Sequence, residues 1–207
     1  MRTALMSLGV LGVLLGAAAA ACGGDEVDCD CAEVGCFADM CTKTVFVLAA
    51  PVPADFGGVA GADQLCAQQA AGAKLSGTYY AWLSDSAQGP FDRFSKSTVP
   101  YVLPDGSPLA EDWESLRASG PATPIDMNAA GVRLEDDDDT HVWSGTGPDG
   151  RTEDFNGASN FCMNWSRNVT DDFTYVGYLR KRDKQFAWTR AAFLACTGTG
   201  LLYCFQQ

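Results

Sequence analysis

The sequence predicts a small α+β domain with long loops. Three observations predict this class: short runs rich in β-branched and aromatic residues, one helix-forming segment that lacks β-branched residues, and stretches rich in Gly, Pro, Asp and Ser between them. The chain has 207 residues, which suits one globular domain of ordinary size with an appendage. The sequence shows no internal repeat of fixed period.

The predicted elements follow from these patterns in chain order. Thr44 to Ala49 is a β-branched and aromatic run that ends before Pro51, so it predicts a buried strand, and the main domain is expected to span residues 43–207. Ala62 to Gly72 predicts a helix that carries Cys66 and ends at a glycine. Further strands are predicted at 79–83, 100–103, 142–143, 161–165, 176–179 and 201–205, with a helical turn at 112–116 and chain reversals at 104–106 and 145–150.

Residues 1–21 predict an export signal. Arg2 precedes an apolar run that ends in three alanines before Cys22, which is typical of a cleavage site. The apolar run is near the lower limit for a membrane-spanning helix, so cleavage is favoured over a retained anchor. A small-residue run that ends in Cys resembles a bacterial lipoprotein signal, which implies a lipid on Cys22 that tethers the protein to a membrane. Such signals usually have Leu where this chain has Ala19, and free secretion is the alternative.

The remaining eight cysteines fall into two groups. The first lies in a predicted acidic, Cys-rich stalk over residues 22–42 and comprises Cys29, Cys31, Cys36 and Cys41. Two local disulfides are favoured over a zinc site, because the paired Cys-x2-Cys knuckles of structural zinc sites are absent and export favours oxidised thiols. Spacing leaves the pairing of these four open. The second group, spread along the domain as a frame, comprises Cys66, Cys162, Cys196 and Cys204.

A set of motifs in one order resembles endostatin, and more closely the endostatin-related domain of uncharacterised bacterial surface lipoproteins. The motifs are Gly61-Ala-Asp-Gln-Leu-Cys66, Ala81-Trp-Leu-Ser84, Val142-Trp-Ser-Gly145, Phe161-Cys-Met-Asn-Trp165 and Leu202-Tyr-Cys204. The resemblance covers residues 43–207 and implies a C-type-lectin-like fold, with short helices packed on a twisted antiparallel sheet. It also implies nested disulfides, Cys66 with Cys204 and Cys162 with Cys196, and structural roles for Asp63 and for Gln68 or Gln69.

Charge limits the partners. With 14 Lys and Arg against 26 Asp and Glu, the net charge of −12 argues against a nucleic-acid groove. The acidic run of Glu135, Asp136, Asp137, Asp138 and Asp139 is expected to be a solvated loop, and a calcium site is the alternative. No other cofactor is expected. The basic cluster that includes Arg180, Lys181 and Arg182 is expected to be an exposed hairpin, with ligand contact as the alternative.

The sequence favours a binding module over an enzyme. His141 is the only histidine, no nucleophile motif accompanies it, and paired cysteines leave no reactive thiolate. The expected function is a non-enzymatic, surface-tethered binding or adhesion module for a protein or glycan, of open oligomeric state. The loops 84–100, 116–141 and 151–162 are the predicted recognition segments. The alternatives are an envelope structural lipoprotein and a polysaccharide hydrolase that uses two carboxylates.

The larger aromatic side chains are predicted to be mostly core. They are Tyr79, Tyr80, Trp82, Trp113, Trp143 and Trp165.

Overall fold

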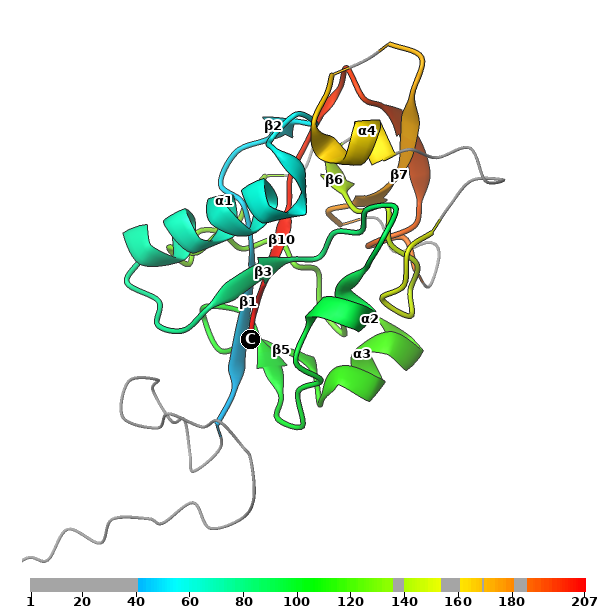
Figure 1. Cartoon of the computed structure of the whole chain (residues 1–207). Helices are drawn as coiled ribbons and strands as arrows, with labels where there is room; N and C mark the ends of the chain where they lie inside the picture. The colour runs from blue at the N-terminus through cyan, green and yellow to red at the C-terminus, as the bar shows by residue number, and fades with distance from the viewer. Residues whose placement is uncertain (1–40, 136–139, 154–160, 169, 181–185) are drawn as a thin grey trace, which may run out of the picture.

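A computed structural model describes residues 41–135, 140–153, 161–168, 170–180 and 186–207. They form a mixed α+β structure (Figure 1). The helices are α1 (Gly58–Gly72), α2 (Pro90–Arg93), α3 (Trp113–Ser119) and α4 (Phe161–Trp165). The strands are β1 (Lys43–Val47), β2 (Val52–Pro53), β3 (Tyr79–Ala81), β4 (Tyr101–Val102), β5 (Pro108–Ala110), β6 (His141–Trp143), β7 (Phe173–Tyr178), β8 (Ala192–Ala195), β9 (Thr199–Gly200) and β10 (Tyr203–Gln206).

β1 lies at the centre of a five-stranded sheet in the order β3-β10-β1-β4-β5. Its residues Val45, Phe46 and Val47 are fully buried, which confirms the first predicted strand. β1 pairs antiparallel with β10 but parallel with β4, so this sheet is mixed and not antiparallel throughout as expected. The chain between β1 and β4 passes through α1, β3 and α2, and a crossover of that length returns a strand in the parallel direction.

Two smaller sheets complete the fold. β2 pairs with β9, and a three-stranded sheet has the order β6-β7-β8. In Figure 1, α1 lies beside β3 and β10, α2 and α3 lie at the lower end near β5, and the three-stranded sheet lies at the upper end with α4. No helix in the described ranges is long and apolar enough to span a membrane.

Helix α1 begins at Gly58 and not at the predicted Ala62, so Gly58 and Gly61 belong to the helix and Gly57 is its N-cap. A Cβ at Gly61 would come within 1.8 Å of the Phe56 carbonyl oxygen, so this close approach requires glycine. The buried side of α1 carries Cys66, whose disulfide to Cys204 joins the helix to β10. This pairing is one of the two that the endostatin resemblance implied.

Asp63 fastens α1 to its neighbours, which confirms its predicted structural role. Its carboxylate accepts the Ala81 N–H at 2.8 Å and two hydrogen bonds from Arg93 Nη2, at 2.6 and 2.5 Å. Arg93 also donates to the carbonyls of Ala81 and Leu83. One partly buried ion pair thus joins α1, β3 and α2. Gln69 has a comparable local role, since its side chain accepts the Ala49 N–H.

The predicted strand at 161–165 is wrong. Phe161 to Trp165 form a left-handed turn, α4, with φ between 49° and 62°. Each such residue costs about 1–2 kcal/mol relative to a right-handed helix, so tertiary contacts must hold the turn. Cys162 is bonded to Cys196, the second implied disulfide, and the buried Trp165 donates its indole N–H to the Ser84 carbonyl at 2.7 Å. The apolar spacing that predicted a strand instead reflects side chains anchored in the core.

The core is aromatic, as predicted. Trp82 is fully buried and lies 4.7 Å from Trp188 and 5.9 Å from Trp113, measured between ring centroids. The other predicted core aromatics that are buried are Tyr79, Trp113, Trp143 and Trp165, whereas Tyr80 is partly exposed. Burial raises the pKa of Tyr79 and of Tyr101 to about 12.

Candidate functional site

Three cationic side chains converge on the ring of Phe91. The Arg151 guanidinium carbon lies 3.6 Å from the ring centroid, Lys96 Nζ lies 4.9 Å from it, and the Arg117 guanidinium carbon lies 5.6 Å from it. Attraction between a cation and the negative face of an aromatic ring favours such an arrangement. We call these four residues the Phe91 cluster. It gathers three cations in a chain whose net charge is −12.

The backbone of α2 and a following turn place Phe91 and Arg151. The Phe91 N–H donates to the Gly150 carbonyl at 2.8 Å, which ties α2 to the turn at 147–150. Gly150 has φ +80°, and a Cβ there would lie 3.0 Å from the Trp113 ring and 3.2 Å from the Phe91 nitrogen. Only glycine fits this close approach without strain. The turn therefore delivers Arg151 directly over the ring.

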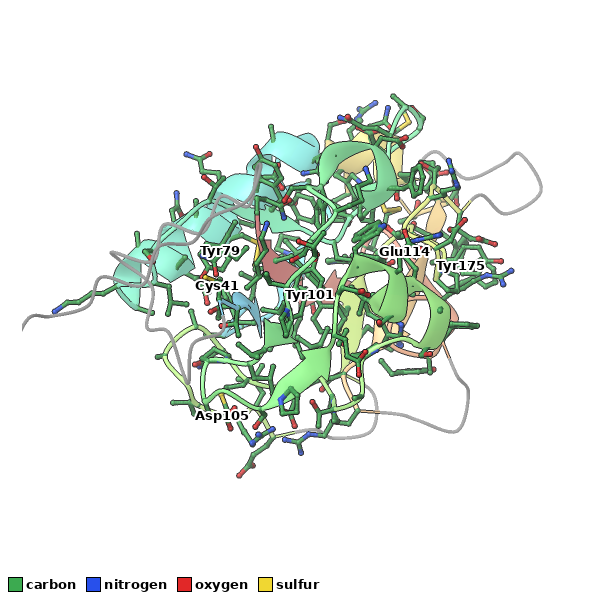
Figure 2. The ribbon with its side chains drawn as sticks, turned by 90° about the horizontal axis from the view of Figure 1, so that it is seen from below. Cys41, Tyr79, Tyr101, Asp105, Glu114 and Tyr175 are labelled. Atoms are coloured by element: carbon green, nitrogen blue, oxygen red, sulfur yellow. A yellow bond between two sulfur atoms is a disulfide. The ribbon has the colours of Figure 1, made fainter. Side chains whose placement is uncertain are left out.

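Lys96 and Arg117 reach the same ring from two other segments. Lys96 Nζ donates to the carbonyls of Phe91 and Phe94 near the end of α2. Arg117 lies on α3, whose N-cap Asp112 accepts the Ser115 N–H at 2.7 Å. The hydrogen bonds that the Ser115 backbone and side chain donate to Asp112 lower the pKa of this carboxyl group. Figure 2 views this underside of the molecule, with Glu114 of α3 labelled.

Carboxylates accompany two of the three cations. Arg117 pairs with Glu114 at 2.9 Å, and Arg151 lies 3.5 Å from Asp149. The Arg151 side chain is 55% exposed, whereas the Arg117 side chain is 26% exposed and its Nε is buried without a hydrogen-bond partner among the described residues. A guanidinium has five N–H donors, and one carboxylate satisfies two of them at most in a bidentate pair. Arg151, the more exposed of the two arginines, therefore keeps N–H donors that Asp149 does not satisfy.

A second surface feature is the exposed aromatic face of the three-stranded sheet. Phe173 and Tyr175 lie two residues apart on β7, and Tyr175 is in register with Phe193 on β8. Phe173 is 54% exposed and Phe193 is 42% exposed, and the rings of Tyr175 and Phe193 are 4.2 Å apart between centroids. We call Phe173, Tyr175 and Phe193 the β7–β8 aromatic face. Tyr175 is labelled in Figure 2.

One short segment connects the two features. Thr152 forms an antiparallel bridge with Thr146, flanked by hydrogen bonds from Gly147 N–H to Arg151 and from Glu153 N–H to Gly145. In an extended segment, side chains two residues apart share one face. Arg151 and Glu153 therefore face the same side. Glu153 pairs with Arg190 at 2.9 Å, and the Arg190 guanidinium lies 5.2 Å from the Tyr175 centroid.

The structure describes only the first residue of the predicted basic cluster, Arg180. Arg180 pairs with Asp126 at 2.9 Å and donates to the Leu134 carbonyl at 2.5 Å, and Asp126 also accepts from Arg133. Asp126 is buried, so this ion-pair network is part of the framework. The Arg180 side chain is 36% exposed, and ligand contact at Arg180 stays a prediction. Lys181 and Arg182 lie outside the described residues.

The predicted calcium site is described only at its first residue. Glu135 is exposed, and Asp136, Asp137, Asp138 and Asp139 lie outside the described residues. Within the part of the chain that the structure describes, no group of three or more His, Cys, Asp or Glu side chains is arranged to hold a metal ion. Calcium binding at this run stays a prediction, and a melting temperature that rises in millimolar calcium relative to chelator would support it.

The stalk and signal predictions fall almost wholly outside the described ranges. Cys22, Cys29, Cys31 and Cys36 are not described, and Cys41 is partly buried at the start of the structure.

His141, the one candidate for acid–base chemistry, begins β6, and its ring lies 5.2 Å from that of Tyr178. Neither observation tests the predicted function.

The Phe91 cluster draws a residue from each of the three predicted recognition loops. Phe91 and Lys96 lie within 84–100, whereas Arg117 lies on α3 at the start of 116–141 and Arg151 is the boundary residue of 151–162. The sequence located the loops but not the cluster, because its members are single residues separated by 60 positions between Phe91 and Arg151. The one local signal was the turn 145–150, whose Gly150 allows the close contact with Phe91.

Comparison with known proteins adds no family. The chain matches no protein-family model, and it matches none of the curated proteins.

Proposed function

We propose that this protein is a non-enzymatic binding or adhesion module for a glycan or protein, tethered to the cell surface through a lipid on Cys22. The domain is proposed to be endostatin-like, with a C-type-lectin-like fold. Two disulfides at the implied positions, Cys66–Cys204 and Cys162–Cys196, support this assignment. Disulfides are also typical of proteins in oxidising compartments outside the cytosol.

The observation that carries the proposal is the convergence of Lys96, Arg117 and Arg151 on the Phe91 ring. A rigid frame with loops that gather at one place is a common arrangement for binding sites. Arg and aromatic side chains are also enriched where proteins bind partners strongly. Lys96 and Arg151 are the exposed cations of the cluster, and both contact the Phe91 ring. The contact surface is therefore assigned to the Phe91 cluster.

A binding panel with matched charge variants tests the proposal. The exported full-length protein is tested against immobilised neutral and acidic polysaccharides, peptidoglycan and whole bacterial cells. The test variant is Lys96→Gln with Arg151→Gln, and the control is Lys74→Gln with Arg167→Gln, which removes the same charge at exposed positions elsewhere. We expect at least one partner whose binding falls about 10-fold in the test variant only, as loss of charge-assisted hydrogen bonds predicts.

Two results would contradict the proposal. One is no retention on any member of the panel by the folded wild-type protein. The other is equal loss in the test and control variants, because that result would reflect overall charge and not the Phe91 cluster. Far-ultraviolet circular dichroism of all three proteins checks that the comparison is made between folded chains.

A further inference from the structure

We infer that the ligand is a carboxylated polysaccharide, a polymer of uronic acid units. Its carboxylates would bind at the Phe91 cluster, and its sugar rings would stack on the β7–β8 aromatic face. This inference rests on the proposed binding function and names its ligand class. It joins two surface features that the sequence did not bring together.

The carboxylate half of the argument starts from Arg151. Its guanidinium carbon lies 3.6 Å from the Phe91 centroid, so the ring restricts the group, and the side chain is 55% exposed. A planar guanidinium with fixed orientation pairs with carboxylates through two parallel hydrogen bonds. Lys96 lies against the same ring and adds a second exposed positive charge. A carboxylate bound between them would be held by two cations from different loops.

The sugar half of the argument starts from the exposed rings. Phe173 is more than half exposed, and Phe193 is partly exposed on the neighbouring strand. Most other large aromatic side chains of the described residues are buried. The C–H faces of pyranose rings pack well on such aromatic surfaces, since both are flat and apolar. The face therefore provides the stacking surface that the Phe91 cluster lacks.

The segment 151–153 makes the two halves one surface and gives it length. Arg151 and Glu153 share a face and lie about 7 Å apart along an extended strand. Glu153 holds Arg190, whose guanidinium lies over Tyr175. A ligand that reaches from Phe91 to Tyr175 must therefore extend well beyond one sugar ring. A polymer with a carboxylate on successive units satisfies this requirement, whereas a monosaccharide does not.

The surrounding acids set a further condition on the ligand. Glu114, Asp149 and Glu153 lie beside the cations and repel a polyanion. The electrostatic attraction of the ligand is therefore weak away from Phe91, and the affinity should depend on the salt concentration. Neutral stacking must then contribute part of the affinity. This condition favours a carboxylated sugar over a polyanion that has no ring face to stack.

The test uses polygalacturonate and three matched probes with the full-length protein at fixed ionic strength. Methyl-esterified polygalacturonate keeps the sugar and removes the charge, poly-L-glutamate keeps the carboxylates and removes the sugar, and dextran sulfate carries sulfate in place of carboxylate. We expect polygalacturonate to bind about 10-fold more tightly than each of the others, which is the effect of one charge-assisted hydrogen bond or more.

Two single variants then locate each half of the site. Arg151→Gln should weaken polygalacturonate binding about 10-fold and leave the weak binding of the methyl ester unchanged. Phe173→Ser should weaken both sugars. The matched controls are Arg167→Gln and Val132→Ser, which change an exposed arginine and an exposed apolar residue outside both features, and they should bind as the wild type does.

The outcomes separate this inference from the proposed function. Equal binding of the methyl ester overturns the carboxylate role, and equal binding of poly-L-glutamate or dextran sulfate overturns the sugar class in favour of any polyanion or an acidic peptide. Absence of polygalacturonate binding overturns the inference altogether. In each case the proposed function still stands if another partner from the panel depends on Lys96 and Arg151, and it fails only if none does.

Discussion

The substitution Asp63→Asn tests whether the Asp63–Arg93 ion pair holds α1, β3 and α2 together. The substitution keeps the shape of the side chain but removes the charge that neutralises Arg93, whose side chain is only 8% exposed. Breaking a buried ion pair from one side costs about 3–5 kcal/mol, because a charge is left without its partner. Asp63 is itself 22% exposed, and Arg93 retains the carbonyls of Ala81 and Leu83. We therefore expect a loss near the lower end, about 3 kcal/mol.

A loss of that size is a large part of the stability of an ordinary domain, which is about 5–15 kcal/mol. For a chain of this length it corresponds to a fall in melting temperature of about 6–12 °C. The assay is urea unfolding followed by tryptophan fluorescence, which reports on the buried Trp82 and its neighbours. The control is Glu114→Gln, which breaks the exposed pair with Arg117 and should cost less than about 1 kcal/mol. If Asp63→Asn lies within 1 kcal/mol of that control, the pair does not hold the frame.

Three other predictions concern the same framework. Replacing Cys66 and Cys204 by alanine should lower the free energy of unfolding by about 5 kcal/mol, and replacing Cys162 and Cys196 should lower it by about 4 kcal/mol. The first disulfide costs more to lose because it closes the longer loop, with a sequence separation of 138 against 34. Urea unfolding that gave the reverse order would contradict this explanation. Asp112→Ala should cost about 1 kcal/mol at pH 7 through loss of the N-cap. Because the folded-state pKa of Asp112 is lowered, its contribution is complete above the unfolded value and disappears as the pH falls through the folded one. The stabilities of wild type and variant should therefore converge as the pH falls below the unfolded pKa of an aspartate. Burial raises the pKa of Tyr79 and Tyr101 to about 12, so absorbance at 295 nm should show two tyrosines that resist ionisation at pH 11, and the stability they contribute should decline as the pH rises from 10 toward 12.

Elements whose own residues determine their structure were predictable. β1 is a β-branched and aromatic run, and α3 begins at Asp112, a good N-cap residue, so local propensity and burial agree. α4 was not predictable, because its left-handed turn depends on Cys196 and Ser84, which lie far away in the chain. β8 was missed for a related reason, since Ala192 to Ala195 is a short run whose strand conformation depends on pairing with β7.

The candidate site shows the same division. The sequence identified the loops, because glycine, proline and polar residues mark them locally. It did not identify Phe91 as their meeting point, because the contact between Phe91 and Gly150 depends on how α2 packs against a turn that follows much later. Attention to the sequence's obvious charge clusters led instead to Arg180, which the buried Asp126 holds in the framework.

Burial of the opposing carboxylate distinguishes structural arginines from those that remain able to bind. Arg93 and Arg180 each face a carboxylate that is largely buried, Asp63 at 22% and Asp126 at 6% exposure. Removing Arg93 would leave Asp63 without its ion-pair partner. Asp126 pairs with both Arg180 and Arg133, and this buried carboxylate draws the two arginines into the framework. Arg117 and Arg151 face Glu114 and Asp149, at 71% and 48% exposure, where solvent screens the pairs and their contribution to stability is small. The exposed ion pairs of these two arginines add little to stability, and this is why we propose that the convergence of cations on Phe91 serves a ligand.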